Sequence, residues 1–119
     1  MNKNYTEFYD EFRRRMTDLN RAMPETMAGF GKLHAATMSA DGALDRKTKE
    51  LIAVAIGISA RCDGCIASHV RSALRAGATR DEIMDTIGVA VFMGGGPSTV
   101  YGAEALQAVD RFERLAVPT

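Results

Sequence analysis

Apolar residues recur at three- and four-residue steps along almost the whole chain, and no stretch shows the strict alternation of a β-strand bounded by turn residues. Such spacing places apolar side chains along one face of an α-helix. The chain has 119 residues, the size of one domain. The sequence therefore predicts an all-α fold, a single-domain helical bundle that spans residues 1–119.

Turn and capping residues divide this chain into about six helices. Two N-terminal helices are expected within residues 5–39, and four more follow. The boundaries fall at Pro24, at the Asp41-Gly42 turn before the capping residue Asp45, at Gly77, at the capping box of residues 79–82, and at the glycines of residues 94–96. The first helix carries an apolar stripe of Tyr5, Phe8, Phe12, Met16, Leu19 and Met23, and the sixth carries Val100, Leu106, Val109 and Phe112.

The third predicted helix, which runs from Asp45 to about Arg61, is apolar on almost every side. A helix of this kind belongs in the centre of a fold. A domain of this size buries only about 65% of the surface that its unfolded chain exposes. We therefore expect a neighbouring subunit to cover part of this helix, in a homo-oligomer. The alternative is that the other five helices cover it completely.

Charge and composition exclude several classes of function. Lys plus Arg number 15 and Asp plus Glu number 15, so the chain lacks the basic excess that binding to nucleic acid requires. The longest apolar stretch, residues 51–60, is about half of what crosses a bilayer. The first residues are polar and do not resemble a secretory signal. We expect a cytoplasmic protein that binds neither nucleic acid nor membrane.

The two cysteines form a C-x-x-C motif, Cys62 and Cys65, and His69 follows one helical turn later. On a helix these three side chains fall within a sector of about 60°. The same face carries Ile66 and Ala73, so the sulfurs are expected to point toward the interior, in a sheltered site. Cysteines three residues apart on a helix have Cα atoms about 5 Å apart, which a disulfide tolerates. The pair is therefore expected to cycle between dithiol and disulfide.

Two arguments disagree about which sulfur is the nucleophile. Helix-end electrostatics favour a thiolate at Cys62, nearer the helix start. His69 lies four residues after Cys65 and is the better placed base for that thiol. We give the histidine more weight, because an oriented base acts on one thiol. Glu50 lies in the apolar third helix, where a buried carboxylate needs a partner, and His69 is the natural one.

Other interpretations of these residues stay open. Glu50, Cys62, Cys65 and His69 could together bind a zinc ion. The cysteines and the histidine could simply be packed in the core. Glu50 could be a solvated residue near a helix start. His34, in the second predicted helix, could approach the site from another subunit or be an isolated surface histidine.

The order Glu50, Cys62-Asp63-Gly64-Cys65, His69 follows the pattern E-x11-C-x-x-C-x3-H. This pattern resembles the alkyl hydroperoxidase D-like branch of the carboxymuconolactone decarboxylase superfamily, and the likeness extends from about Leu44 to Leu106. It implies a core domain of that type over about residues 44–115. One difference is Gly64, where the best-characterised peroxidase of the branch has a histidine.

The resemblance implies an all-α domain that assembles as trimers or hexamers. It also implies that Cys65 attacks hydroperoxides, that Cys62 resolves the product as a disulfide, and that His69 and Glu50 form a proton relay. The disulfide would be reduced by a dithiol partner, a lipoyl-bearing or thioredoxin-like protein. We thus expect a cytoplasmic thiol-dependent peroxidase or disulfide reductase, without cofactor or metal. The alternatives are a non-redox decarboxylase or lyase, and a metal-binding or redox-sensing oligomer without turnover.

Overall fold

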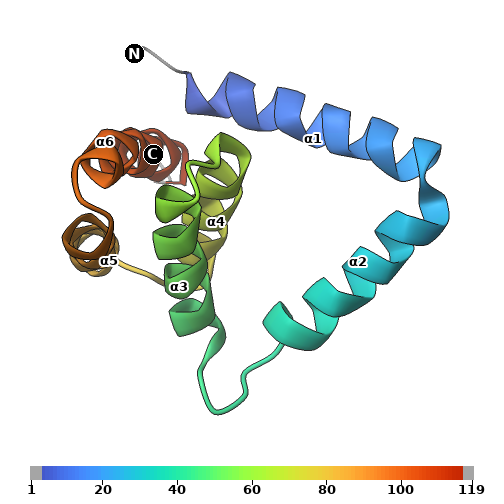
Figure 1. Ribbon diagram of the computed structural model, residues 1–119, viewed down its shortest axis with the longest axis horizontal. Helices are drawn as coiled ribbons and strands as arrows, with labels where there is room; N and C mark the ends of the chain where they lie inside the picture. The colour runs from blue at the N-terminus through green and yellow to red at the C-terminus, as the bar shows by residue number, and fades with distance from the viewer. Residues whose placement is uncertain (1–3, 117–119) are drawn as a thin grey trace.

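The computed structural model describes residues 4–116, and these residues form six helices and no strand (Figure 1). In chain order the helices are α1 (Tyr5–Ala22), α2 (Pro24–Met38), α3 (Arg46–Ser59), α4 (Asp63–Arg75), α5 (Arg80–Gly94) and α6 (Gly96–Ala116). The predicted all-α fold and the number of helices are confirmed. No helix in this part of the chain is both long and apolar enough to cross a membrane.

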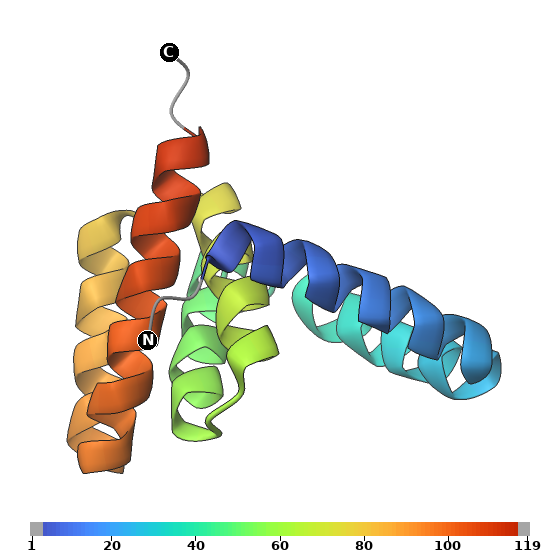
Figure 2. The ribbon, with the colours of Figure 1, turned by 90° about the horizontal axis from the view of Figure 1, so that it is seen from above.

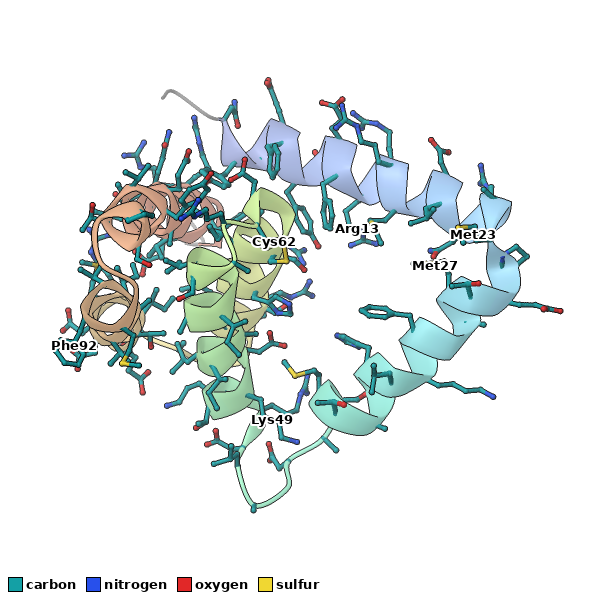
Figure 3. All side chains as sticks on the ribbon, in the orientation of Figure 1. Arg13, Met23, Met27, Lys49, Cys62 and Phe92 are labelled. Carbon is teal, nitrogen blue, oxygen red and sulfur yellow. A yellow bond between two sulfur atoms is a disulfide. The ribbon has the colours of Figure 1, made fainter. Side chains whose placement is uncertain are left out.

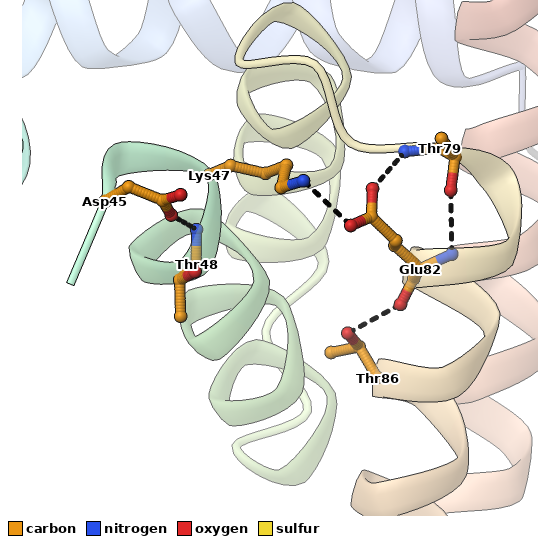
Figure 4. Close-up of polar contacts among 6 residues, drawn as sticks. All are labelled: Asp45, Lys47, Thr48, Thr79, Glu82 and Thr86. Atoms are coloured by element: carbon orange, nitrogen blue, oxygen red, sulfur yellow. Dashed lines mark hydrogen bonds and ion pairs between the residues drawn. The ribbon is translucent and has the colours of Figure 1, made fainter.

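The helix ends follow the capping residues that the sequence indicates. Asp45 caps α3, and its carboxylate accepts a hydrogen bond of 2.7 Å from the Thr48 amide (Figure 4). Thr79 and Glu82 form the predicted capping box at the start of α5, with each side chain bonded to the other's backbone amide. Gly77 has a φ of +96° after α4, in the left-handed region that glycine tolerates best.

Helices α3 to α6 form the compact body of the molecule (Figure 2). Helix α3 packs against α4, α5 and α6, which confirms its predicted central position. It is nevertheless not covered on every side, since Ile52 is 43% and Ile56 62% exposed. The alternative interpretation, that the chain's other five helices cover α3 completely, is therefore wrong. Val100 of α6 is also exposed, although the sequence placed it with the apolar residues of that helix.

Helices α1 and α2 form an arm that extends from the body in a V (Figure 1). Only the first half of α1 packs on α4 and α6: Tyr5 is fully buried, and its hydroxyl donates a hydrogen bond of 2.7 Å to Glu104. Burial, and then this hydrogen bond, raise the pKa of the Tyr5 phenol. The predicted apolar stripe is not buried along its length, because Leu19 and Met23 are exposed beyond the body.

The second helix of the arm, α2, has no buried residue. Its C-terminal end is held to the body by Lys49 of α3, whose ammonium donates to the carbonyl oxygens of Thr37 at 2.9 Å and Ala40 at 3.0 Å (Figure 3). A cation at the end of a helix is favourable there, because the last carbonyls lack partners within the helix. This contact places the arm so that its inner side faces α3 and α4.

Candidate redox site

The turn between α3 and α4 determines where the first cysteine lies. The Cys62 amide donates to the Gly57 carbonyl at 3.0 Å, and the Arg61 amide donates to Ile58 at 3.1 Å. This pair of bonds is a Schellman motif, in which the residue that donates the second bond has a left-handed backbone conformation. That residue is Arg61, with a φ of +57°. The motif ends α3 and places Cys62 as the N-terminal cap of α4.

Cys62 and Cys65 form a disulfide, with Cα atoms 5.2 Å apart. The predicted spacing of the pair is confirmed. The Cys62 sulfur also accepts a hydrogen bond of 3.2 Å from the Cys65 amide at the start of α4. Free amides at a helix N-terminus stabilise negative charge, so a reduced Cys62 would share in this effect.

His69 and Glu50 meet between α4 and α3. The ring Nδ1 of His69 lies 2.7 Å from Glu50 Oε1. An ionised carboxylate can only accept, so the His69 Nδ1–H donates to it, and in the neutral ring Nε2 then carries the lone pair. Glu50 is only 8% exposed. The predicted partnership is therefore confirmed, and the interpretation of Glu50 as a solvated residue is wrong.

The site lies less deep than the sequence predicted. Cys62, Cys65 and His69 are all half-buried, whereas the fully buried side chains of α4 are those of Ile66, Ala67, Val70 and Ala73. The cysteine sector is therefore at the edge of the core-facing side of α4. Figure 3 shows Cys62 on the side of the body that faces the arm. The expectation that the sulfurs point into the interior is therefore wrong, because they lie at the edge of the core.

The first helix covers this edge through Phe12. A cavity of about 220 Å³ beside the disulfide is lined by Phe8, Phe12, Cys62 and Gly64, with Glu11 and Arg15 at α1. A Cβ added to Gly64 would lie 2.8 Å from Phe12 Cε1. The absence of a side chain at Gly64 therefore lets the Phe12 ring lie against the start of α4, where it bounds the approach to Cys62.

Three residues that shape the site were not among the predicted ones. Gly57 is buried, and a Cβ there would lie 3.2 Å from the Cys65 Cβ, so this glycine lets α3 approach α4 closely. Gly57 lies five residues before Cys62, and Phe12 is distant in sequence. The sequence near the C-x-x-C motif therefore does not indicate that either residue belongs to the site. Arg61 likewise occupies a position where the sequence offers no glycine as a marker.

His34 of α2 is exposed and lines a cavity that Glu50 also lines, within one chain. Within residues 4–116 no group of three or more histidine, cysteine, aspartate or glutamate side chains is placed to hold a metal ion.

Comparisons with known proteins show the family and the fold of the chain. The sequence profile described as the carboxymuconolactone decarboxylase family matches residues 24–108. An uncharacterized protein of Cupriavidus necator is 38% identical over 108 residues, which cover 84% of this chain and 94% of that protein. An uncharacterized protein from the cox locus of Paracoccus denitrificans is 37% identical and covers 82% of this chain and 98% of its own length.

Two crystal structures have the same fold. The apo form of a carboxymuconolactone decarboxylase family protein of Legionella pneumophila is 44% identical, with a TM-score of 0.86 over 91% of this chain and 96% of that one. A protein of the same family from Thermotoga maritima, described as a candidate for involvement in an antioxidative response, is 26% identical. Its TM-score is 0.78 over 88% of this chain and 92% of its own.

Proposed function

Because the chain belongs to the carboxymuconolactone decarboxylase family, we propose that it is a thiol-dependent peroxidase, which reduces organic hydroperoxides through a Cys62 and Cys65 dithiol–disulfide cycle. One observation carries the proposal. A disulfide at the start of α4 lies on the same helix as His69, which a nearly buried carboxylate orients at 2.7 Å. The description of the Thermotoga relative in connection with an antioxidative response agrees with it.

In the first step His69 Nε2 removes the proton from Cys65, one helical turn before it. The Cys65 thiolate attacks the terminal oxygen of the hydroperoxide and breaks the O–O bond. Cys65 becomes a sulfenic acid, and the alkoxide takes the proton from His69 and leaves as an alcohol. Glu50 holds the ring in the required tautomer and stabilises its charged form.

In the second step the Cys62 sulfur attacks the sulfenic sulfur, water leaves, and the disulfide forms. The net reaction converts two thiols and one hydroperoxide to one disulfide, one alcohol and one water. A dithiol, carried by a lipoyl-bearing or thioredoxin-like partner, then supplies the two electrons and two protons that restore the thiols. Such a cycle suits the cytoplasm, where reducing partners are abundant.

Mass spectrometry of the reduced protein after one equivalent of cumene hydroperoxide tests the chemistry. We expect the loss of two hydrogen atoms in the wild type and no such loss in Cys65→Ser. Turnover with dithiothreitol as reductant should be abolished in Cys65→Ser. In His69→Ala it should fall about a hundredfold, the size of a general-base contribution, with a changed pH profile.

Lys32→Ala is the control, because it truncates an exposed side chain of α2 that lines neither cavity described beside the site, and it should keep turnover within about twofold. A wild-type protein that keeps both thiols after peroxide treatment would refute the proposal. Oxidation without turnover would instead identify a redox sensor. A decarboxylase or lyase would remain active after both cysteines are replaced by serine.

A further inference from the structure

A second cavity adjoins the carboxylate of the relay. It has a volume of about 400 Å³ and lies between the end of α2, the start of α3 and the second half of α4. Its wall contains Glu50, three arginines from α3 and α4, and residues of α2. The arginines are Arg46, Arg71 and Arg75, and the α2 side includes His34.

The arginines of this cavity are not paired with carboxylates. Within the described residues none of the three guanidinium groups forms an ion pair. Glu50 is the one carboxylate on the cavity wall, and it is bonded to His69. Because the whole chain has equal numbers of acidic and basic residues, this concentration of cations is local.

Two nearby aspartates are engaged elsewhere. Asp41 and Asp45 line an adjacent cavity with Arg46 and Arg75. The Asp41 carboxylate accepts from the Arg46 amide at 2.7 Å, and Asp45 accepts from the Thr48 amide at 2.7 Å. Both therefore serve the start of α3, and neither lies within ion-pair distance of a guanidinium of this cavity.

Arg71 is held in place before any ligand binds. Its guanidinium lies over the Tyr9 ring, 4.9 Å from the ring centre, and donates to the Tyr9 hydroxyl at 3.3 Å. A planar guanidinium fixed in this way loses little conformational freedom when it binds a carboxylate or a phosphate with its remaining donors. Arg75, one turn later on α4, and Arg46 are exposed and free to close on the same anion.

We infer that this cavity binds an oxyanion, a carboxylate or a phosphate, carried by the organic hydroperoxide that the enzyme reduces. The inference rests on the proposed function and adds the class of substrate to it. The arginines bind the anionic group on their side of the cavity, and the peroxide end of the molecule extends past Glu50 toward His69 and Cys65, which lie outside the cavity wall. Three unpaired guanidinium groups at a half-enclosed wall favour an anion over a neutral alkyl group.

The test compares two hydroperoxides that differ in one group, cumene hydroperoxide and its para-carboxylate, with dithiothreitol as reductant. We expect kcat/KM for the carboxylate to fall about fivefold in Arg75→Gln, since an exposed ion pair contributes up to this factor. The double variant Arg46→Gln/Arg75→Gln should lose about tenfold or more. In these variants the kcat/KM for cumene hydroperoxide should stay within about twofold of the wild type. The control Arg14→Gln, which removes an exposed arginine of α1, should leave kcat/KM unchanged for both substrates.

An equal loss for both substrates, or an unchanged ratio of their kcat/KM values, overturns the inference. Competition distinguishes the two anions: inhibition by benzoate indicates a carboxylate, inhibition by inorganic phosphate indicates a phosphate, and inhibition by neither overturns the inference. If the wild type reduces no hydroperoxide, the proposed function fails. The cavity is then tested by titrating the protein with benzoate or phosphate while following the arginine Nε–H resonances, and absence of saturable shifts overturns the inference by itself.

Discussion

Phe12 bounds the approach to the Cys62 sulfur, and its position depends on Gly64. Thiol–disulfide exchange is limited by access to the attacked sulfur. We therefore predict that Phe12→Ala speeds reduction of the disulfide by glutathione about threefold or more, because a bulky thiol then reaches Cys62 directly. The release of protein thiols under pseudo-first-order conditions measures this rate.

Phe30→Ala is the matched control, since it removes a ring of the same size from an exposed position on α2 that does not line this cavity. Gly64→Ala should also speed reduction of the disulfide, because the added Cβ would displace the Phe12 ring. Equal reduction rates in all of these proteins would show that Phe12 does not limit access.

The sequence predicts those site residues that lie close to one another along the chain. Cys62, Cys65 and His69 share one helix, so their spacing alone places them together, and the cost of a buried charge identifies Glu50 as their partner. Phe12 and Gly57 act through contacts between helices, which depend on interaxial distance and not on periodicity. The depth of the site escaped prediction for the same reason, because it is set by where α1 leaves the body.

A Schellman motif also ends α4, where the Ala78 amide donates to the Ala73 carbonyl at 2.9 Å and the Gly77 amide donates to Leu74 at 3.0 Å. Gly77 occupies the left-handed position after α4, and Arg61 occupies it after α3. A side chain in this conformation costs energy that glycine avoids. We predict that Arg61→Gly stabilises the protein by about 0.5–1 kcal/mol and that Gly77→Ala destabilises it by about 1 kcal/mol.

Urea unfolding of the three proteins measures these free energies, and the slope with denaturant should be unchanged because the fold is the same. Arg61→Gly should also leave the Cys62 cap in place, so the disulfide still forms. A loss of stability in Arg61→Gly would show that the arginine side chain makes a favourable interaction that outweighs the conformational cost.

An ion pair joins the start of α3 to the start of α5. Lys47 Nζ lies 2.8 Å from Glu82 Oε2, while Glu82 Oε1 accepts from the Thr79 amide (Figure 4). The hydrogen bond from Lys47, and then that from the Thr79 backbone, lower the pKa of Glu82. The same contact raises the pKa of Lys47.

These pKa shifts determine how the stability contributed by the ion pair changes with pH. The stabilisation by Glu82 is complete above its unfolded pKa of about 4.3 and is lost as the pH falls through the lower folded pKa. The contribution of Lys47 is complete below its unfolded pKa of about 10.4 and is lost as the pH rises through the higher folded pKa. We predict that Glu82→Gln has a lower melting temperature at pH 7 and loses less stability than the wild type on acidification.

Thermal unfolding between pH 3 and pH 7 measures this difference, and the two curves should converge at the acid end. Asp85→Asn is the control, because Asp85 is an exposed carboxylate of the same helix without an ion pair among the described residues. Parallel curves for Glu82→Gln and the wild type would contradict the assigned shift.

The elements themselves were largely predictable, because a cap is a short-range signal. Asp45, Thr79 and Gly77 all act within one turn of the helix that they begin or end. The path of α2 was not, since its residues are exposed and its position depends on Lys49. An apolar stripe on α1 predicts a buried face but does not say which molecule buries it.

The whole molecule exposes more surface than a chain of its mass needs to. Its accessible surface is 7593 Å², against about 6,300 Å² for a folded monomer of this size. The radius of gyration is 14.5 Å, against about 13.5 Å for a compact chain of this length. The excess of about 1,300 Å² exceeds the roughly 800 Å² that one partner contributes to a standard interface.

Exposed large apolar side chains lie on two separate parts of the molecule. One is the arm, with Leu19, Met23, Phe30 and Leu33 exposed. The other is the body, where Val89, Phe92 and Met93 share one face of α5 by their spacing, and Ile52, Ile56 and Val100 are exposed on α3 and α6. Figure 3 shows Phe92 pointing away from the arm, so one chain cannot bring Phe92 against the arm.

We therefore predict a homo-oligomer in which the outer face of α5 is buried by another copy. Phe92 is 85% exposed in the single chain, and a carboxylate at its place would be costly to bury in an interface. Phe92→Asp should dissociate the assembly to the 12.9 kDa chain, as measured by light scattering after size-exclusion chromatography. Phe92→Leu should keep the native mass, because it preserves an apolar side chain.

Circular dichroism must show the helices of Phe92→Asp intact, since the position is outside the core. A wild-type protein that elutes with the mass of one chain, or a Phe92→Asp variant with the wild-type mass, would show that this face is not an interface.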